Sequence, residues 1–251
     1  MTDIEAFLYS EINLFALAVL FLIYFNMSRR ADKHLLEQKL FTALIAATAG
    51  IILLDTAMWL LDGRPGGMVT VLYYAVTAGY YLMNPVIGGI WTLYADYQVY
   101  RSGKRFRKLL TPVLLPMFFC AVLAFSSTFT HSMFFIDQNN VYHRGPYFAL
   151  IAVVSFLYPI YTLLVVLAQR GRMQRHTFVP MLLFPIAPLI GGVIQIFFYG
   201  VSLIWSCAAI SILAIFINIQ NYQLYTDYLT GLFNRRELDH FLQQLQSGAD
   251  D

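Results

Sequence analysis

Two acidic side chains lie inside long apolar stretches of this 251-residue sequence, where an ionised carboxylate is costly to bury. Glu11 lies in the first of these stretches, and Asp55 lies in the second. Trp59 follows Asp55 by one helical turn, so the two side chains would share a helix face. A carboxylate next to an indole suits a small organic ligand that carries an amine or several hydroxyls. We therefore take Glu11, Asp55 and Trp59 as candidate ligand-binding residues.

Three aromatic or amide residues are expected at a similar depth to Asp55. They are Tyr74, Gln195 and Trp205, in the third, sixth and seventh apolar stretches. Together with the acidic residues they would form a half-polar cavity open to the outside. Two simpler interpretations stay open. Trp and Tyr also anchor helices at bilayer interfaces, and Asp55 could hydrogen-bond a neighbouring helix.

The third apolar stretch carries two further features. Asp96 lies five residues before Arg101, and we expect it to form an ion pair at the inner membrane interface. Asn84 and Pro85 fall in the middle of the stretch, where the proline removes one helical hydrogen bond. This pair would act as a pivot or only shape the helix.

The elements that must position these residues are apolar helices. Hydrophobic residues make up 59% of the chain and charged residues only 12%, whereas a soluble domain is about 25% charged. This composition excludes a soluble enzyme, a disordered chain and a disulfide scaffold, and continuous apolar runs exclude a β-barrel. We predict an all-α, polytopic seven-helix bundle. Its spans are residues 5–27, 40–61, 68–98, 109–128, 146–168, 178–199 and 202–221.

The basic residues predict the orientation of this bundle. Twelve of the 16 lysines and arginines, including every lysine, fall in the breaks after spans one, three and five. The other side carries only Arg64 and Arg144. The positive-inside rule therefore places the N-terminus outside and the C-terminus in the cytoplasm. We expect these basic loops to contact anionic lipid heads and not nucleic acid.

The sequence becomes polar after about Asn218, where span seven could continue as a helix. Its residues Leu213, Ile217, Gln220 and Leu224 have the spacing of a short heptad seam, although a frayed helix end is an equal alternative. Residues 227–236 then read Asp-Tyr-Leu-Thr-Gly-Leu-Phe-Asn-Arg-Arg. Within them, Asn234 can cap a short amphipathic helix.

Residues 227–236 resemble the opening motif of the GGDEF domain of diguanylate cyclases, Asp-x-Leu-Thr-Gly-Leu-x-Asn-Arg-Arg, at all eight specified positions. Residues 54–65, 93–98 and 142–147 are also similar to membrane regions that precede such domains in bacterial proteins. In the family the motif joins a signalling helix to the catalytic domain. The resemblance thus implies that Asp227, Asn234, Arg235 and Arg236 couple signals and carry no chemistry.

The resemblance implies three parts: a sensor domain over residues 1–221, a signalling helix over 213–227 and the start of a GGDEF domain over 227–251. Such a protein would lie in the bacterial inner membrane as a homodimer, paired through span seven and the signalling helix. It would answer a small-molecule ligand by making cyclic di-GMP. The family's catalytic residues lie beyond Asp251, so we expect this chain to be no enzyme and to hold no cofactor. GTP and Mg²⁺ would belong to the missing output domain, inside which we expect the sequence to end.

Other membrane functions fit the residue content less well. A retinal protein needs a lysine within a span, and a membrane haem protein needs histidines there, yet all of these residues fall in loops or the tail. A small transporter stays open, because Gly88-Gly89 and Gly191-Gly192 could mark broken helices. A stand-alone membrane module without cyclase output is the other alternative.

Overall fold

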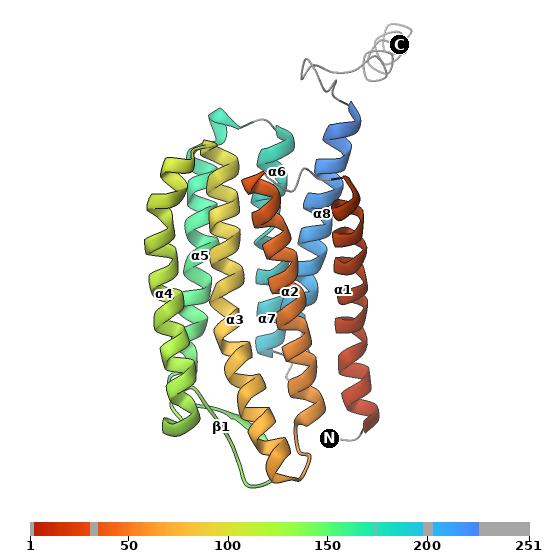
Figure 1. Cartoon of the computed structure of the whole chain (residues 1–251), viewed down its shortest axis with the longest axis vertical. Helices are drawn as coiled ribbons and strands as arrows, with labels where there is room; N and C mark the ends of the chain where they lie inside the picture. Colours follow the sequence, from red (N-terminus) through yellow and green to blue (C-terminus); the bar gives the residue numbers. More distant parts are fainter. Residues whose placement is uncertain (1–2, 31–34, 174, 198–202, 226–251) are drawn as a thin grey trace, which may run out of the picture.

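The chain folds into a bundle of long, roughly parallel helices in the computed structural model (Figure 1). The model describes residues 3–30, 35–173, 175–197 and 203–225. The first four helices are α1 (Asp3–Arg30), α2 (Leu36–Leu61), α3 (Gly67–Tyr100) and α4 (Gly103–Thr130). After two short strands come α5 (Phe148–Ala168), the 3-10 helix η1 (Arg170–Arg172), α6 (Arg175–Leu183), α7 (Ile186–Phe197) and α8 (Ile204–Tyr225).

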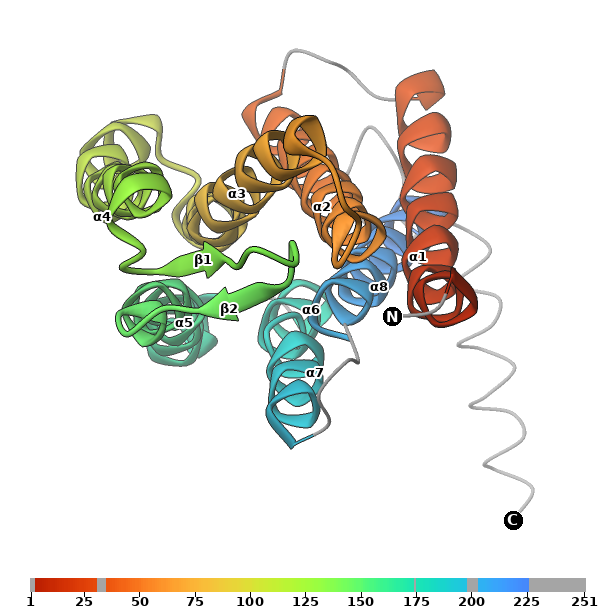
Figure 2. The same cartoon turned by 90° about the horizontal axis from the view of Figure 1, so that it is seen from below.

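The bundle is that of an all-α, multi-pass membrane protein. Among the described residues, six helical segments are long and apolar enough to cross a bilayer: α1, α2, α4, α5, α6 with α7, and α8. Many large apolar side chains on these helices face outward, as lipid contact requires. The 34-residue α3 carries seven tyrosines and lies between α2 and α4, and it also packs against α5 (Figure 2).

The segment predicted as one span over residues 178–199 is interrupted. Helix α6 ends at Leu183 and α7 starts at Ile186, with Phe184 and Pro185 between them. Pro185 has no N–H to donate to Met181 four residues earlier, and its ring opposes a continuous helix there. On the two sides of the break, α6 packs against α5 and α8, and α7 packs against α8.

The loop predicted between spans four and five contains a small antiparallel hairpin of β1 (Phe134–Ile136) and β2 (Tyr142–Arg144). It lies across one end of the bundle (Figure 2). Ser127 of α4 holds it there, because its hydroxyl oxygen accepts from the backbone N–H groups of Met133 and Phe134 at 2.9 and 3.0 Å. We refer to this end, where α1 also begins, as the hairpin end (Figure 1).

Two glycine pairs that suggested broken helices serve close packing. Helix α3 runs without a break through Gly88 and Gly89. A Cβ on Gly88 would lie 2.9 Å from Cβ of Tyr158 on α5, and one on Gly191 would lie 3.0 Å from Sγ of Cys207 on α8. These glycines let neighbouring helix backbones approach, which is their usual role in membrane bundles.

Candidate functional site

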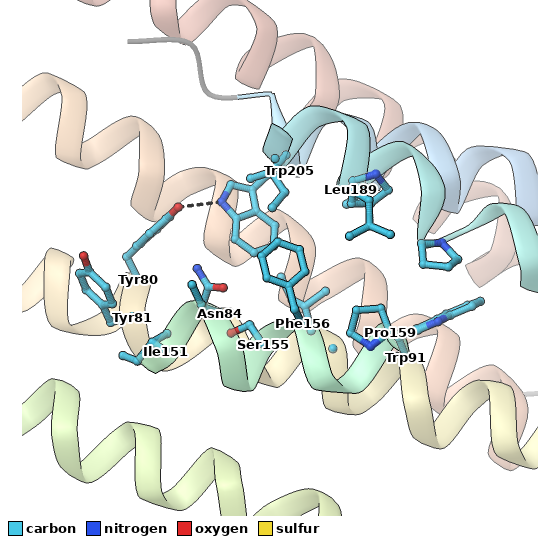
Figure 3. A pocket seen from close by; sticks show the side chains of 18 of the residues that line it. Tyr80, Tyr81, Asn84, Trp91, Ile151, Ser155, Phe156, Pro159, Leu189 and Trp205 are labelled. Carbon is cyan, nitrogen blue, oxygen red and sulfur yellow. Dashed lines mark hydrogen bonds between the residues drawn. The ribbon is translucent and has the colours of Figure 1, made fainter. Parts of the chain in front are cut away.

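A cavity of about 260 Å³ lies between α3, α5, the α6–α7 break and the start of α8. Its walls come from residues 80–91 of α3, 148–159 of α5, 184–192 around the break and 204–208 of α8. Figure 3 shows side chains from these four elements facing one space. Four segments that are far apart in the sequence therefore enclose one cavity of a size that suits a small ligand.

Seven of the 21 residues that line the cavity are aromatic. The rings of Trp91 and Phe184 stack with their centroids 3.7 Å apart. The Trp205 indole N–H donates to the Tyr80 hydroxyl at 3.1 Å, and these two rings meet edge to face (Figure 3). The wall thus favours a flat apolar ligand, which can stack on the rings.

Two buried donors on the cavity wall have no hydrogen-bond partner among the described residues: the indole nitrogen of Trp91 and the hydroxyl of Ser155. Trp91 is only 1% exposed. Buried polar atoms are almost always hydrogen-bonded, and each unmet one costs about 1–3 kcal/mol. The unmet groups indicate that a polar atom of a ligand or a water belongs beside them.

Prolines add acceptors to the same wall. The lining residues Tyr81 and Ser155 each lie four positions before a proline, Pro85 and Pro159, inside an α-helix. A proline has no N–H, so the carbonyls of Tyr81 and Ser155 lack their usual helical donor. Ser155 therefore has both a hydroxyl without a partner among the described residues and a carbonyl without its helical donor.

Arg144, at the end of β2, is the one charged residue among the described residues that line the cavity. It is also the exposed member of that lining, so it marks the hairpin end of the chamber. Its guanidinium lies 4.6 Å from the ring centre of Phe148, and the described residues give it no carboxylate partner. A cation held against an aromatic ring at the edge of an apolar chamber is suited to meet an anion.

Of the residues predicted to bind a ligand, Trp205 lines this cavity. Tyr74 instead holds the hairpin, since its hydroxyl accepts from the backbone N–H of Ile136 at 3.2 Å. Trp59 is half-buried on α2, and Glu11 is exposed on α1. Gln195 lies in α7, with its side chain outside the described part of the chain.

Asp55 lies in a buried polar cluster that joins three helices. The side-chain amide of Asn13 on α1 donates to the Asp55 carboxylate at 2.9 Å and to the Thr56 hydroxyl at 3.1 Å. The Ser206 hydroxyl on α8 lies 3.5 Å from the Asn13 amide oxygen. Since Ser206 follows the cavity residue Trp205, this cluster is directly connected to the cavity wall.

Asp96 forms an ion pair, as its position predicts, but with Arg105 of α4 and not with Arg101. The two carboxylate oxygens lie 2.9 and 3.1 Å from the Arg105 guanidinium Nε. Arg101 pairs with Glu37 at the start of α2. These pairs tie together α2, α3 and α4 at the end of the bundle opposite the hairpin.

Sequence reasoning missed Trp91, Ser155 and Arg144 as cavity residues. Arg144 carried a signal, because it is one of two basic residues on its side of the predicted bundle. Asn84, expected with Pro85 to act as a pivot or to shape the helix, also lines the cavity. The predicted coupling residues Asp227, Asn234, Arg235 and Arg236 lie outside the described residues.

Comparison with known proteins adds no relative: neither a family model nor a curated protein matches the chain.

Proposed function

We propose that the chain is the membrane input region of a bacterial cyclic di-GMP signalling protein. The observation that carries this proposal is the agreement of residues 227–236 with all eight specified positions of the GGDEF opening motif. In this reading the bundle binds a small ligand and passes the signal to a cytoplasmic diguanylate cyclase domain. GTP and Mg²⁺ act in that domain, and Asp227, Asn234, Arg235 and Arg236 join it to the bundle.

The proposed topology has seven spans, which are the six apolar segments and the tyrosine-rich helix α3. Helix α3 is about 50 Å long at 1.5 Å per residue, more than enough to cross a bilayer. Arg64 and Arg144 belong to the hairpin end, and the ion-paired Arg101 and Arg105 belong to the other. The positive-inside rule then puts the hairpin outside and the end of α8 in the bacterial cytoplasm.

Helix α8 physically links the cavity to the motif that precedes the proposed cyclase domain. Trp205 and Ala208 on its first turns line the cavity, and the helix continues to Tyr225, two residues before Asp227. A ligand that binds two positions of α8 with different affinity would change which position is populated. Such a shift would reach the motif through one continuous helix of about 30 Å.

The test uses the natural gene in its own host. Its reading frame should continue beyond the Asp251 codon into the Gly-Gly-Asp/Glu-Glu-Phe loop, and its deletion should lower cellular cyclic di-GMP. Asp227→Ala should abolish the gene's contribution while the protein stays in the membrane. Tyr228→Ala, at an unspecified position of the motif, is the matched control. A stop codon directly after Asp251, or unchanged cyclic di-GMP on deletion, would refute the proposal.

A small transporter is the second candidate, and the break between α6 and α7 favours it. Interrupted helices with exposed backbone groups line the substrate sites of many transporters, and Phe184 and Pro185 at this break line the cavity. Uptake of a labelled cavity ligand into proteoliposomes would separate the two functions. A sensor should bind the ligand without moving it across the membrane.

A further inference from the structure

We propose that the cavity binds an elongated aromatic carboxylate that carries a hydroxyl at the end far from the carboxylate. The proposal names the ligand class of the input function proposed above, and its role as a signal rests on that function. Binding itself is measured on the purified chain and needs no output domain.

The charged residues that line the cavity indicate the charge of the ligand. Arg144 brings a positive charge to the cavity, and the described lining residues include no Asp or Glu. Asp55, the carboxylate expected to attract an amine, already accepts from the Asn13 amide at 2.9 Å and does not line the cavity. A ligand anion would therefore gain a partner at Arg144, while a ligand cation would meet an uncompensated positive charge.

The shape of the ligand follows from the walls. Tyr80 and Trp91 both line the cavity and lie eleven residues apart on α3, so the chamber extends about 16 Å along that helix. The stacked rings of Trp91 and Phe184 lie at one end of it, and Trp205 is hydrogen-bonded to Tyr80 at the other. These rings and the neighbouring prolines favour a flat, rigid molecule, which loses little conformational entropy on binding.

The polar groups without hydrogen-bond partners indicate that the ligand carries a hydroxyl. The hydroxyl of Ser155 has no partner among the described residues, and the carbonyl of the same residue, four residues before Pro159, has lost its helical donor. A hydroxyl is both a donor and an acceptor, so it can bond to each of these groups. Ser155 lies about two helical turns along α5 from Phe148, the ring that Arg144 contacts, so this hydroxyl belongs at the end of the ligand far from the carboxylate.

The first test measures charge preference by calorimetry on the purified chain in lipid nanodiscs, with empty nanodiscs as the blank. The probes are biphenyl-4-carboxylate, its uncharged carboxamide and the cationic 4-phenylbenzylammonium. The carboxylate should bind at least about tenfold more tightly than the carboxamide, and the ammonium should bind most weakly. Arg144→Gln should remove this preference, while Arg64→Gln should keep it. Arg64 is the exposed arginine of the same end that does not line the cavity.

The second test measures the deep polar contact. In the wild-type chain, 4′-hydroxybiphenyl-4-carboxylate should bind about tenfold more tightly than biphenyl-4-carboxylate. Ser155→Ala should reduce this gain, and Ser126→Ala on α4 should leave it unchanged, because Ser126 bonds within its own helix at 2.9 Å.

Equal binding of the three charge types, a preference that survives Arg144→Gln, or no gain from the hydroxyl would overturn the proposed ligand class. None of these outcomes bears on cyclic di-GMP production. Conversely, loss of the cyclase function would leave the binding results intact, so the two proposals fail separately.

Discussion

The side-chain amide of Asn13 donates a 2.9 Å hydrogen bond to the carboxylate of Asp55, 42 residues further along the chain. Asn13 is completely buried, and Asp55 is 6% exposed. The bond joins α1 to α2, and through Ser206 the same cluster reaches α8. An acidic residue in an apolar stretch thus stabilises the bundle here, next to the helix that we propose to carry the signal.

We predict that Asn13→Leu lowers the free energy of unfolding by about 1–3 kcal/mol, because Asp55 loses a donor where water cannot replace it. The measurement is unfolding of the purified chain by SDS in mixed micelles. Asn26→Leu is the matched control, since Asn26 is exposed on the same helix. If both variants unfold alike, the Asn13–Asp55 bond does not stabilise the fold.

The spacing between α3 and α5 leads to a second prediction. Gly88→Ala should destabilise the bundle by about 1–3 kcal/mol through overpacking, because its new Cβ would lie 2.9 Å from Cβ of Tyr158. Gly79→Ala on the same helix should have little effect, since the nearest atom to its Cβ would be a Leu54 methyl carbon at 3.5 Å. Thermal unfolding in detergent compares the two variants, and equal melting temperatures would contradict the close approach of α3 and α5.

The helices could largely be predicted from the sequence because each span is a local property of about 20 residues. The predicted span 40–61 falls within α2, for example, and 109–128 falls within α4. The break at Pro185 has a local signal in Pro180, Pro185 and Pro188, but hydropathy alone predicts one continuous span there.

The cavity could not be predicted in the same way, because it depends on which helices are neighbours. Ser155 and Trp91 are 64 positions apart and look like ordinary span residues. Asn13 was overlooked next to the charged Glu11, although the packing of α1 buries Asn13 and leaves Glu11 exposed. Polarity in a span is visible in the sequence, but the face that meets another helix is fixed by tertiary packing.

The hairpin should respond to pH through Asp137. The backbone N–H of Val141 and the side chain of His143 both bond to its carboxylate, and they hold the pKa of Asp137 below its usual value. A carboxyl group whose pKa is lowered by folding stabilises the folded state at pH values above its ordinary pKa of about 3.9. This stability is lost as the pH falls through the folded-state pKa.

Asp137→Asn should therefore lower the melting temperature at pH 7, and the difference from wild type should shrink as the pH is lowered below about 4. Thermal unfolding across this pH range measures the effect. Gln138→Glu supplies a control at the exposed neighbouring position. A difference between Asp137→Asn and wild type that stays constant with pH would show that the Asp137 carboxylate does not stabilise the hairpin.

The last prediction follows from the proposed dimer and concerns the exposed face of α8. The expected seam contained Leu213, but Leu213 packs against the core of its own bundle. Along the described part of α8, the exposed positions are Ile210, Ala214, Ile217 and Asn221. Their four-three-four spacing is that of a heptad seam, so a second copy would pair along this line and share only Ile217 with the seam expected from sequence.

Single cysteines at positions 214 and 217 should therefore form disulfides between copies in oxidised membranes, in a chain with Cys120 and Cys207 replaced by alanine. Cysteines in place of Ile212 and Ile215 should not, because both residues are buried within one bundle and a disulfide requires Cα atoms about 4.4–6.8 Å apart. Val153→Cys, exposed on α5, measures random collision in the membrane. Cross-linking at position 153 as strong as at 214 and 217 would mean that α8 is not the pairing helix, and the signal would then need another route between copies.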